Sequence, residues 1–266
     1  MKVEYLRHSG TDLDVVNAAK VSFSKESQWE YDTIMVPGFA EAIYPQHINP
    51  HLSQKDINLI NYLARGTSTV EWENIVHDLI GAKDETFVRE IVDDLIHKAV
   101  HWVPFSHNSI TLRMAAPIPI RVHCFKHKIG FTESEESRRY ISSTPELHIP
   151  EEFHTRPANV KQGSSDYVHG SSELYRREYK KICSKAIDLY EEMVNANVAP
   201  EEARYVLPQG VIVNWIWTGN LASYARYYNQ RSDSHAQKDS QILAEEVRKI
   251  IEPLFPVSWA ALTRRK

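Results

Sequence analysis

Charged and hydroxyl side chains gather between residues 125 and 140, where their types and spacing suit the binding of an anion. In chain order they are Lys126, His127, Lys128, Thr132, Glu133, Ser134, Glu135, Glu136, Ser137, Arg138 and Arg139. The helix dipole alone favours Lys and His at the end of a helix, and this simpler explanation stays open for the first three. The arginine pair beside Ser137 is harder to explain as a cap, because guanidinium groups grip phosphate through paired hydrogen bonds. The segment therefore predicts a phosphate-binding loop after a short helix.

A second group of polar side chains lies between residues 231 and 237. Ser232 and Asp233 suit the start of a helix, and His235 follows Arg231 by four residues, so one helix face would present both side chains. The Arg231 guanidinium offers donors to two adjacent carbonyl-like acceptors, as on the edge of a uracil ring. An ordinary capped surface helix is the alternative interpretation.

Weaker signals stand at three other places. His101 and His107 flank an aromatic turn, which either lines a flat ring or packs around a satisfied histidine. No Cys or paired acid accompanies them at ligand spacing, so a metal site is not expected. Arg204 follows two glutamates with which it could simply pair, and Asn220 could be a helix-terminal residue. No dinucleotide-binding glycine motif or P-loop occurs, so a Rossmann turn is not expected to hold any nucleotide cofactor.

Composition limits the classes of protein to which this chain can belong. It has 266 residues, of which 42% are hydrophobic and 25% charged, as in a globular protein with a sizeable core. The net charge of -4 argues against a protein that coats nucleic acid, but not against a small anion held by a few arginines. The sequence contains no apolar stretch of about 18 residues, so a membrane span is not expected. The only cysteines, Cys124 and Cys183, predict no disulfide framework and a cytoplasmic location, in the host if the source is a virus.

The elements that must position these side chains are mostly helical by periodicity. Strands are expected at 3–6 and 109–114, and residues 24–52, with Pro37, Pro45 and Pro50, are expected to form an irregular, ligand-capable loop. Helices are expected at 12–21, 56–65, 70–79, 85–97, 119–127, 172–196, from 200, at 215–229 and at 234–251. The expected fold class is α+β, a mixed sheet packed with helices and a helical C-terminal half, in one domain over 1–266.

These segments, in this order, resemble the flavin-dependent thymidylate synthases. The family hallmark is Arg-His-Arg followed shortly by Asn-Glu-x-Ser-x-Arg-Tyr, which stands here at 126–128 and 134–140. Segments 17–23, 101–107, 204–208 and 229–237 are similar to other family motifs, and 161–164 is similar to a feature of the phage-type branch. The resemblance covers most of the chain.

The chain departs from the family pattern at several positions. Lys126 and Lys128 replace both hallmark arginines, which keeps the charge and loses the bidentate geometry. Ser134 replaces the usual Asn, and one extra residue stands between Lys128 and Ser134. Residues 66 to 98, helical by pattern, form an insertion for which the resemblance implies no role.

The resemblance implies a homotetramer with shared active sites that methylates dUMP to dTMP, using FAD, NADPH and methylene-tetrahydrofolate. FAD would meet Val103, Lys126, His127, Lys128, Glu135, Asn220, Leu221, Ala222 and Arg226, and His101 would help place the nicotinamide or folate. The substrate dUMP would meet His123, Cys124, Phe125, Lys126, Glu135, Glu136, Ser137, Arg138, Arg139, Arg204 and Arg231. Arg231 would be the catalytic residue, polarising the uracil ring, and Cys124 a packing residue rather than a nucleophile.

Three other functions remain open from the sequence. The substituted hallmark also fits a related enzyme that hydroxymethylates a pyrimidine nucleotide. The two lysines, Ser134 and the insertion also fit a nucleotide-binding homologue without catalysis. A helical interaction protein without a ligand would bind no flavin.

Overall fold

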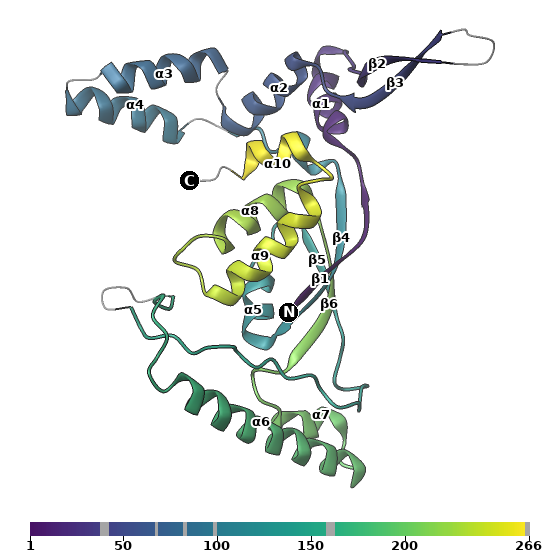
Figure 1. The fold of residues 1–266 in the computed structure, drawn as a ribbon, viewed down its shortest axis with the longest axis vertical. Helices are drawn as coiled ribbons and strands as arrows, with labels where there is room; N and C mark the ends of the chain where they lie inside the picture. Colours follow the sequence, from purple (N-terminus) through teal and green to yellow (C-terminus); the bar gives the residue numbers. More distant parts are fainter. Residues whose placement is uncertain (38–42, 67–68, 82–83, 98–99, 158–162, 264–266) are drawn as a thin grey trace. The chain divides into compact units, whose positions relative to one another are not determined.

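The computed structural model describes residues 1–266 except 38–42, 67–68, 82–83, 98–99, 158–162 and 264–266 (Figure 1). The described chain divides into two compact units, Met1–His8 with Ile110–Ile250 and Ser9–Ser109 with Ile251–Lys266. The expectation of one domain over the whole chain stays a prediction. No helix within the described ranges is long and apolar enough to cross a membrane.

The first unit is built on a four-stranded sheet with the order β1-β4-β6-β5. Its strands are β1 (Lys2–Ser9), β4 (Ser109–Pro117), β6 (Ile212–Gly219) and β5 (Phe131–Glu135). The central strand β6 pairs antiparallel with both β4 and β5. Leu112, Met114, Trp215 and Trp217 alternate with more exposed neighbours and are buried, as expected for strands with one packed face. The predicted α+β class, with a sheet packed by helices, is confirmed.

Helices α5 (Ile118–Phe125), α8 (Leu221–Arg231) and α9 (Lys238–Ile251) lie over one face of this sheet (Figure 1). The ring of Trp217 packs edge to face against Tyr224 and Tyr227 of α8, with centroids 5.4 and 5.0 Å apart. Such aromatic pairs contribute about 0.5–1.5 kcal/mol each beyond the burial of their area. The packing anchors α8 on the sheet and so fixes both of its ends.

The expected helix over 215–229 is wrong in its first third. Residues up to Gly219 belong to strand β6, and α8 begins only after Asn220, whose side-chain oxygen accepts from the Ser223 amide at 2.9 Å. A short apolar run cannot be assigned to helix or strand by periodicity alone. These residues form a strand because they pair with β4 on one side and β5 on the other, and the buried Trp215 and Trp217 alternate with more exposed residues.

The helix expected over 234–251 begins later, at Lys238. Residues 232–237 form turns instead, in which the Asp233 carboxylate accepts from the His235 backbone amide at 2.9 Å. Arg231 is therefore the last residue of α8 and His235 lies in the following turn. The two side chains do not share a helix face, because Asp233 stabilises a turn where a helix start was expected.

The long helix α6 and two short helical elements complete the first unit. The long helix α6 (Ser172–Asn195) confirms the predicted one and buries Cys183, Ile187 and Tyr190. It is followed by α7 (Pro200–Ala203) and the short 3₁₀ helix η4 (Arg204–Val206). The Tyr190 hydroxyl donates to the Ile141 carbonyl at 3.0 Å, which ties α6 to the loop that leaves the sheet.

The second unit packs helices around its own core. These are α1 (Asp12–Lys20), η1 (Val21–Phe23), α2 (Gln54–Arg65), η3 (Val103–Ser106) and α10 (Pro256–Leu262). Val16, Ile60, Phe105 and Trp259 are almost fully buried. The buried Asp12 carboxylate accepts from the amides of Val257 and Ser258 at 2.8 and 2.9 Å, so it caps the start of α10.

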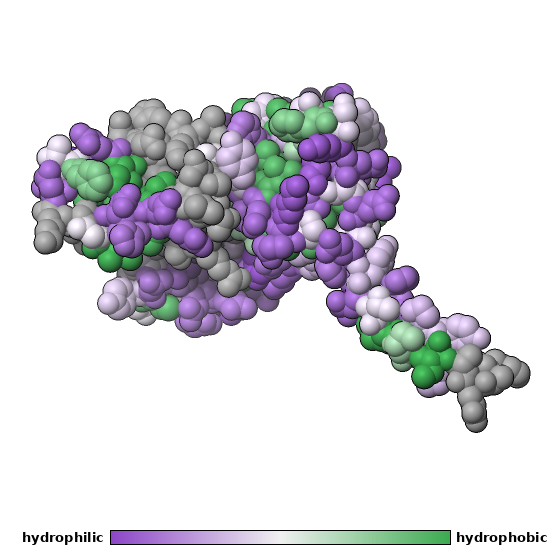
Figure 2. Space-filling view, turned by 90° about the horizontal axis from the view of Figure 1, so that it is seen from above, coloured by the Kyte–Doolittle hydropathy of each residue, from purple (hydrophilic) through white to green (hydrophobic). Residues whose placement is uncertain are grey.

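Two features of the second unit extend beyond its core. Helices α3 (Thr69–Gly81) and α4 (Glu85–His97) stand where the helical insertion was expected. Residues 24–52 are not the expected irregular loop, because β2 (Glu30–Pro37) and β3 (Ile43–His51) pair as an antiparallel ribbon. Each strand of an isolated ribbon has a free edge, which tolerates proline because a missing amide donor costs no ladder bond there. The ribbon carries exposed apolar side chains, including Met35 and Ile43, and forms the narrow arm in Figure 2.

Candidate functional site

The centre of the candidate site is the C-terminal end of α5, where Arg231 reaches back from the end of α8. Its Nε donates to Nε2 of His127 at 3.0 Å, and its Nη2 donates to the His123 carbonyl at 3.3 Å. Burial and the nearby Arg231 and Arg226 charges lower the pKa of His127 to about 4. The imidazole is therefore neutral near pH 7, with its proton on Nδ1 and Nε2 free to accept. Arg231 Nε and Nη2 therefore donate to acceptors within the protein, and the other N–H groups of the guanidinium remain for a ligand.

Cys124 lies beneath this arrangement and is unsuited to nucleophilic attack. Its side chain is buried, and its Sγ lies 3.7 Å from the Tyr227 hydroxyl. Burial raises the pKa of the Cys124 thiol to about 12, so a thiolate is scarce at neutral pH. Tyr227 also places its ring edge against His127, with centroids 5.2 Å apart. The geometry agrees with a packing role for Cys124.

Two ion pairs join α5 and the turn after it to strand β5. Lys128 Nζ lies 2.9 Å from Glu133 Oε1, and Arg121 Nη2 lies 3.2 Å from Glu135 Oε1. The cations of Arg121 and Lys128 lie 5.2 and 5.7 Å from the centroid of the Phe125 ring. Glu133 and Glu135 share a face of β5 because they are two residues apart. Sequence reasoning missed Arg121, since nothing in the sequence shows which acid an α5 arginine would meet.

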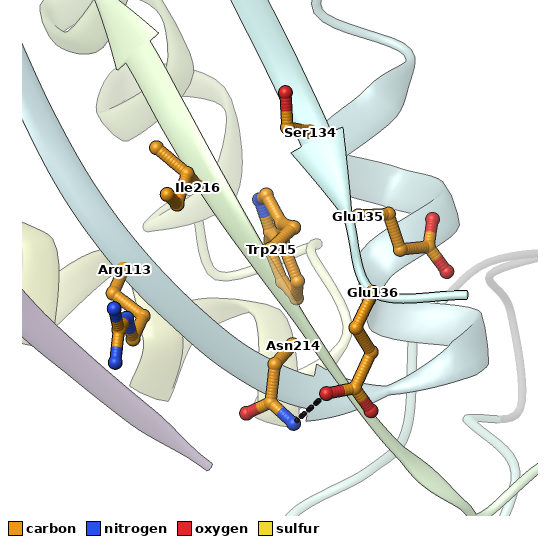
Figure 3. A pocket seen from close by; sticks show the side chains of 7 residues that line it. All are labelled: Arg113, Ser134, Glu135, Glu136, Asn214, Trp215 and Ile216. Carbon is orange, nitrogen blue, oxygen red and sulfur yellow. Dashed lines mark hydrogen bonds between the residues drawn. The ribbon is translucent and has the colours of Figure 1, made fainter. Parts of the chain in front are cut away.

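A cleft of about 470 Å³ opens on the opposite face of the sheet from this pair, because Glu135 pairs with Trp215 on the face that α5 covers and Ser134 pairs with Ile216 on the other face. Strands β4, β5 and β6 line it with Arg113, Ser134, Glu135, Glu136, Asn214, Trp215 and Ile216 (Figure 3). The Glu136 carboxylate accepts from the Asn214 amide at 3.0 Å, whereas the Glu135 side chain points away from Asn214 (Figure 3). Burial raises the pKa of Glu135, Arg121 opposes that effect, and Glu136 adds to it. Asn214 was not predicted as a site residue, because part of its strand was predicted to be a helix.

The turn after α5 packs directly on the first turn of α8. The Ser223 hydroxyl donates to the Ile129 carbonyl at 2.9 Å, and Arg226 Nη2 donates to the same carbonyl at 3.2 Å. Gly130 has a φ of +75°, and a Cβ there would lie 2.1 Å from Ser223 Oγ. Only glycine fits this contact without displacement. Arg226 Nη2 also lies 3.4 Å from Ser223 Oγ, so this exposed cation is at the first turn of α8, whose dipole is positive. Lys126 and Lys128 are exposed on the segment that follows α5.

The arginines predicted to bind phosphate lie together on the loop after β5 and on η4. Arg139 Nε pairs with Glu201 Oε2 at 3.0 Å, and Arg204 Nε donates to the Glu201 backbone carbonyl at 3.1 Å. The Arg139 and Glu201 side chains are each about half exposed, at 52% and 51%. Arg138 turns elsewhere and donates to the Ser143 carbonyl. The Ser137 hydroxyl accepts from the Arg139 amide at 3.4 Å, a long bond that leaves it able to rearrange.

Several predicted positions lie outside this grouping. His101 and Val103 belong to the second unit, where the His101 ring stacks on Tyr62 with centroids 5.8 Å apart and Val103 starts η3. Residues 161 and 162 of the phage-type feature lie outside the described residues. Within the part of the chain that the structure describes, no three His, Cys, Asp or Glu side chains are grouped to hold a metal ion.

Comparison with protein families gives a match over almost the whole chain. The family described as "Thymidylate synthase complementing protein" matches residues 4–257. A flavin-dependent thymidylate synthase of Streptomyces avermitilis is 26% identical over 269 residues, covering 97% of this chain and 89% of the relative. The enzyme of the same name from Kosmotoga olearia is 33% identical over 164 residues, covering 60% and 70%.

Solved structures agree on the fold. A UMP/dUMP methylase, PolB from Streptomyces cacaoi bound with 5-Br dUMP, superposes with a TM-score of 0.67 at 23% identity, covering 98% of this chain and 94% of the other. The same methylase bound with 5-Br UMP gives a TM-score of 0.65 at 22% identity. At 22–23% identity, these superpositions show that the chain shares the fold of the methylase.

Proposed function

Because the chain belongs to the flavin-dependent thymidylate synthase family, we propose that it reductively methylates dUMP to dTMP with FAD, methylene-tetrahydrofolate and NADPH. The observation that carries the proposal is Arg231, anchored through His127 and the His123 carbonyl at the end of α5. An anchored guanidinium orients a flat ring through directed donors and stabilises charge that develops on ring oxygens. Arg231 is accordingly the proposed catalytic residue.

The state of Cys124 supports a reaction without an enzyme thiolate. Methylation of uracil C5 can be initiated by a thiolate that adds to C6, which requires an activated thiol. Burial keeps the Cys124 thiol protonated, and the pKa of Cys183, the other free cysteine, is also raised by burial. Bound FAD supplies the missing chemistry, hydride transfer from its reduced ring, while the protein contributes orientation and electrostatics.

The residues around the start of α8 fit a cofactor with two phosphates. Arg226 places a cation at the positive end of the 11-residue helix α8, which is a favourable setting for phosphate groups, and Lys126 and Lys128 add exposed cations on the segment before the Gly130 turn. We assign to FAD these cations, His127, Glu135 and the helix start at Asn220, Leu221 and Ala222. The Gly130 turn supports the assignment, because it brings the chain carrying these cations onto the helix start.

The phosphate of dUMP is assigned to Arg139 and Arg204, beside Ser137 and Arg138. Both guanidiniums gather around Glu201, so a dianionic phosphate would meet two preplaced cations once Arg139 leaves the carboxylate. His123, Cys124, Phe125, Lys126, Glu135 and Glu136 are assigned to the uracil and sugar side. This division puts ring orientation at the end of α5 and charge recognition at η4.

The remaining assignments rest on family membership. His101 and Val103 are proposed to meet the nicotinamide, folate or flavin in a homotetramer with shared sites. A cytoplasmic location and the phage-type branch belong to the same proposal. Sedimentation of the purified protein tests the oligomer, with a monomer as the result that would contradict it.

The deciding experiment combines a spectrum with a product mass. The purified protein is loaded with FAD, dialysed and titrated with dUMP, and then supplied with NADPH and methylene-tetrahydrofolate. A retained flavin spectrum that shifts with dUMP, and a product heavier by one methylene unit, support the proposal. A hydroxymethyl product would establish the related hydroxymethylase instead. A flavin-free protein that binds dUMP would establish a non-catalytic homologue. UMP is tested in parallel, because the solved structural relative is a UMP/dUMP methylase.

A further inference from the structure

The β2–β3 ribbon carries apolar side chains on both of its faces. In the observed register, Tyr31, Met35 and Ile43 belong to one face, and Ile34 and Tyr44 belong to the other. All five side chains are 42–62% exposed, and Figure 2 shows apolar surface along this arm. A two-stranded ribbon is only marginally stable by itself in water, so apolar surface of this kind indicates a contact with another chain.

The two edges of the ribbon differ in the backbone groups that they offer. Met35 pairs with Pro45 across the ribbon. Two positions further, Pro37 pairs with Ile43, so both prolines belong to the same set of alternating pairs. Because proline has no amide, this is the set whose backbone groups point away from the ribbon. The β2 edge therefore offers the outward amides of Thr33 and Met35, whereas Pro45 leaves the β3 edge without a donor at its middle.

The β2 edge also lacks the charges that usually protect an edge strand. Residues 30–51 include no Lys or Arg, and the first proline of β2 is its last residue, Pro37. The Asp32 carboxylate is engaged within the ribbon, where it accepts from the Asn49 side-chain amide at 3.2 Å and lies 3.6 Å from His51 Nε2. An edge with free amides and few charges is a template for another strand.

We propose that the β2 edge pairs antiparallel with the β2 edge of a second copy of this chain, around a two-fold axis at Thr33. Such a contact is self-complementary, because the same surface serves on both copies. The register places Thr33 opposite its own equivalent and Tyr31 opposite the partner's Met35. A shift by one pair would bring Pro37, which has no amide donor, into the new ladder. The result is a four-stranded sheet whose two outer edges are the proline-bearing β3 strands.

The exposed area and the charges of the ribbon both fit a second copy. At about 200 Å² for a fully exposed large side chain, the five apolar residues leave roughly 500 Å² on each ribbon. That is a large part of the about 800 Å² that each partner buries in a standard interface. Edge pairing covers some of this surface, and the four-stranded sheet presents the rest to further copies. The two Asp32 side chains do not oppose each other in this register, and each lies beside a histidine of its own ribbon.

The inference adds a specific contact to the proposed homotetramer. It rests on the proposed function only for the number of copies, because the pairing of the two edges involves no residue assigned to FAD or dUMP. The contact can therefore be tested on the purified protein without turnover.

A disulfide tests the register directly. Thr33→Cys brings two thiols together across the axis, where hydrogen-bonded partners on antiparallel strands have Cα atoms about 5.5 Å apart, a distance that a disulfide spans. Mild oxidation is expected to convert most of this variant to a covalent dimer on a non-reducing gel. His47→Cys is the matched control, because His47 stands opposite Thr33 on the β3 edge and is expected to stay uncrosslinked. The native Cys124 and Cys183 are buried. No cross-link in Thr33→Cys, or equal cross-linking in both variants, overturns the proposal.

Proline at the same two positions tests the backbone donors. Thr33→Pro removes an outward amide, so the β2–β3 ladder keeps its bonds while the two bonds at the axis are lost. The dissociation constant of this contact is expected to rise by at least about tenfold, as for two lost backbone hydrogen bonds. Sedimentation over a dilution series measures this rise as a halving of the assembly's mass.

His47→Pro is the control for this measurement. It removes the outward amide of the other edge and the same side-chain contact, in which Thr33 Oγ1 lies 3.2 Å from His47 Nδ1. Its mass is expected to match the wild type, and thermal unfolding of both variants shows whether the fold is retained. A folded Thr33→Pro protein that sediments as the wild type overturns the proposal. If Thr33→Pro unfolds, the disulfide decides.

The proposed function and this contact fail separately. A protein that ignores FAD and dUMP but cross-links through Thr33→Cys would defeat the function and support the contact. A flavin-binding protein whose Thr33→Cys variant stays uncrosslinked would support the function and overturn the contact. A wild-type monomer at every concentration overturns the contact whatever the flavin spectrum shows.

Discussion

The two places where arginines are proposed to bind the substrate are built in opposite ways. At the end of α5, Arg231 is partly buried and its guanidinium rests on a neutral imidazole and a backbone carbonyl. On the loop after β5, Arg139 is about half exposed and rests on the carboxylate of Glu201. Arg231 meets uncharged acceptors that leave its charge available, whereas Arg139 meets a carboxylate that the proposed phosphate ligand would have to replace.

The difference is consistent with the proposed division between orientation of the ring at Arg231 and recognition of the phosphate charge at Arg139. Geometry that must be held to a few tenths of an ångström needs rigid packing, which Tyr227 and Trp217 provide beneath His127. A phosphate carries enough charge to reorganise exposed side chains, so its arginines need less support. Variants at the two places should therefore fail differently.

The largest effect is expected from Arg231→Ala. Loss of the anchored donor is expected to lower kcat by about 100- to 1000-fold, the usual effect of removing a group that stabilises developing charge. FAD should remain bound, as measured by the flavin spectrum after dialysis. Arg231→Lys should recover little, because an ammonium group lacks the fork. If Arg231→Ala turned over within a few fold of wild type, Arg231 would not be the orienting and catalytic arginine.

Gly130→Ala tests whether the turn after α5 must lie on the start of α8. The substitution adds a Cβ 2.1 Å from Ser223 Oγ at a φ of +75°. The left-handed backbone alone costs about 1–2 kcal/mol, and the clash adds to it. We expect weaker FAD retention and a lower midpoint of thermal unfolding. Gly170→Ala is the control, since a Cβ there meets nothing within 4 Å. Equal flavin retention in both variants would contradict the assigned role of the turn.

Variants of Arg139 and Glu201 are expected to change the KM for dUMP in opposite directions. Arg139 is the proposed phosphate-binding group, and the Glu201 carboxylate competes with the phosphate for it. Arg139→Ala is expected to raise the KM for dUMP by about tenfold, as for loss of one charge-assisted hydrogen bond, with a smaller change in kcat. Glu201→Gln removes the competing carboxylate and is expected to lower that KM by about twofold, in line with an exposed ion pair. High salt should weaken dUMP binding. A lower kcat with unchanged KM in Arg139→Ala would place this arginine in orientation instead.

The neutral histidine predicts how stability depends on pH. His127 has a pKa of about 4 in the folded chain and an ordinary value of 6.5 when unfolded, so only the unfolded chain takes up a proton between these values. The free energy of unfolding should therefore fall as the pH falls from 6.5 to about 4, and the loss should level off below that. His123 acts in the same direction, because its pKa is also lowered by burial and Arg231. His127→Gln should flatten the dependence, measured by denaturant unfolding at each pH.

The smallest effect is expected from Cys124→Ala. The thiol has only a weak contact with the Tyr227 hydroxyl, and burial keeps it protonated. We expect kcat within about twofold of wild type and a loss of about 1 kcal/mol in stability, as for removal of one small buried group. Complete loss of turnover with intact dUMP binding would show that the thiol takes part in the reaction.

Much of the candidate site follows from residue types and their order along the chain. The helix expected over 119–127 is α5, which begins one residue before Pro119 and ends at Phe125, and the charged residues that follow it lie on the turn and on β5. Motif order also predicted the family that the comparison establishes over residues 4–257. These features are local, because proline, caps and periodicity act within a few residues of each other.

Only the tertiary structure decided which of these residues meet. Arg231 and His127 are separated by 104 positions and were expected in different roles, yet they share a hydrogen bond. Arg121 meets Glu135 only because α5 packs beside strand β5. Strand β6 was taken in part for a helix, since a short apolar run is ambiguous until its neighbours on the sheet are known. The sequence by itself thus determined the chemical groups and their local supports, whereas long-range packing decided their partners, their burial and hence the pKa values on which the proposed function depends.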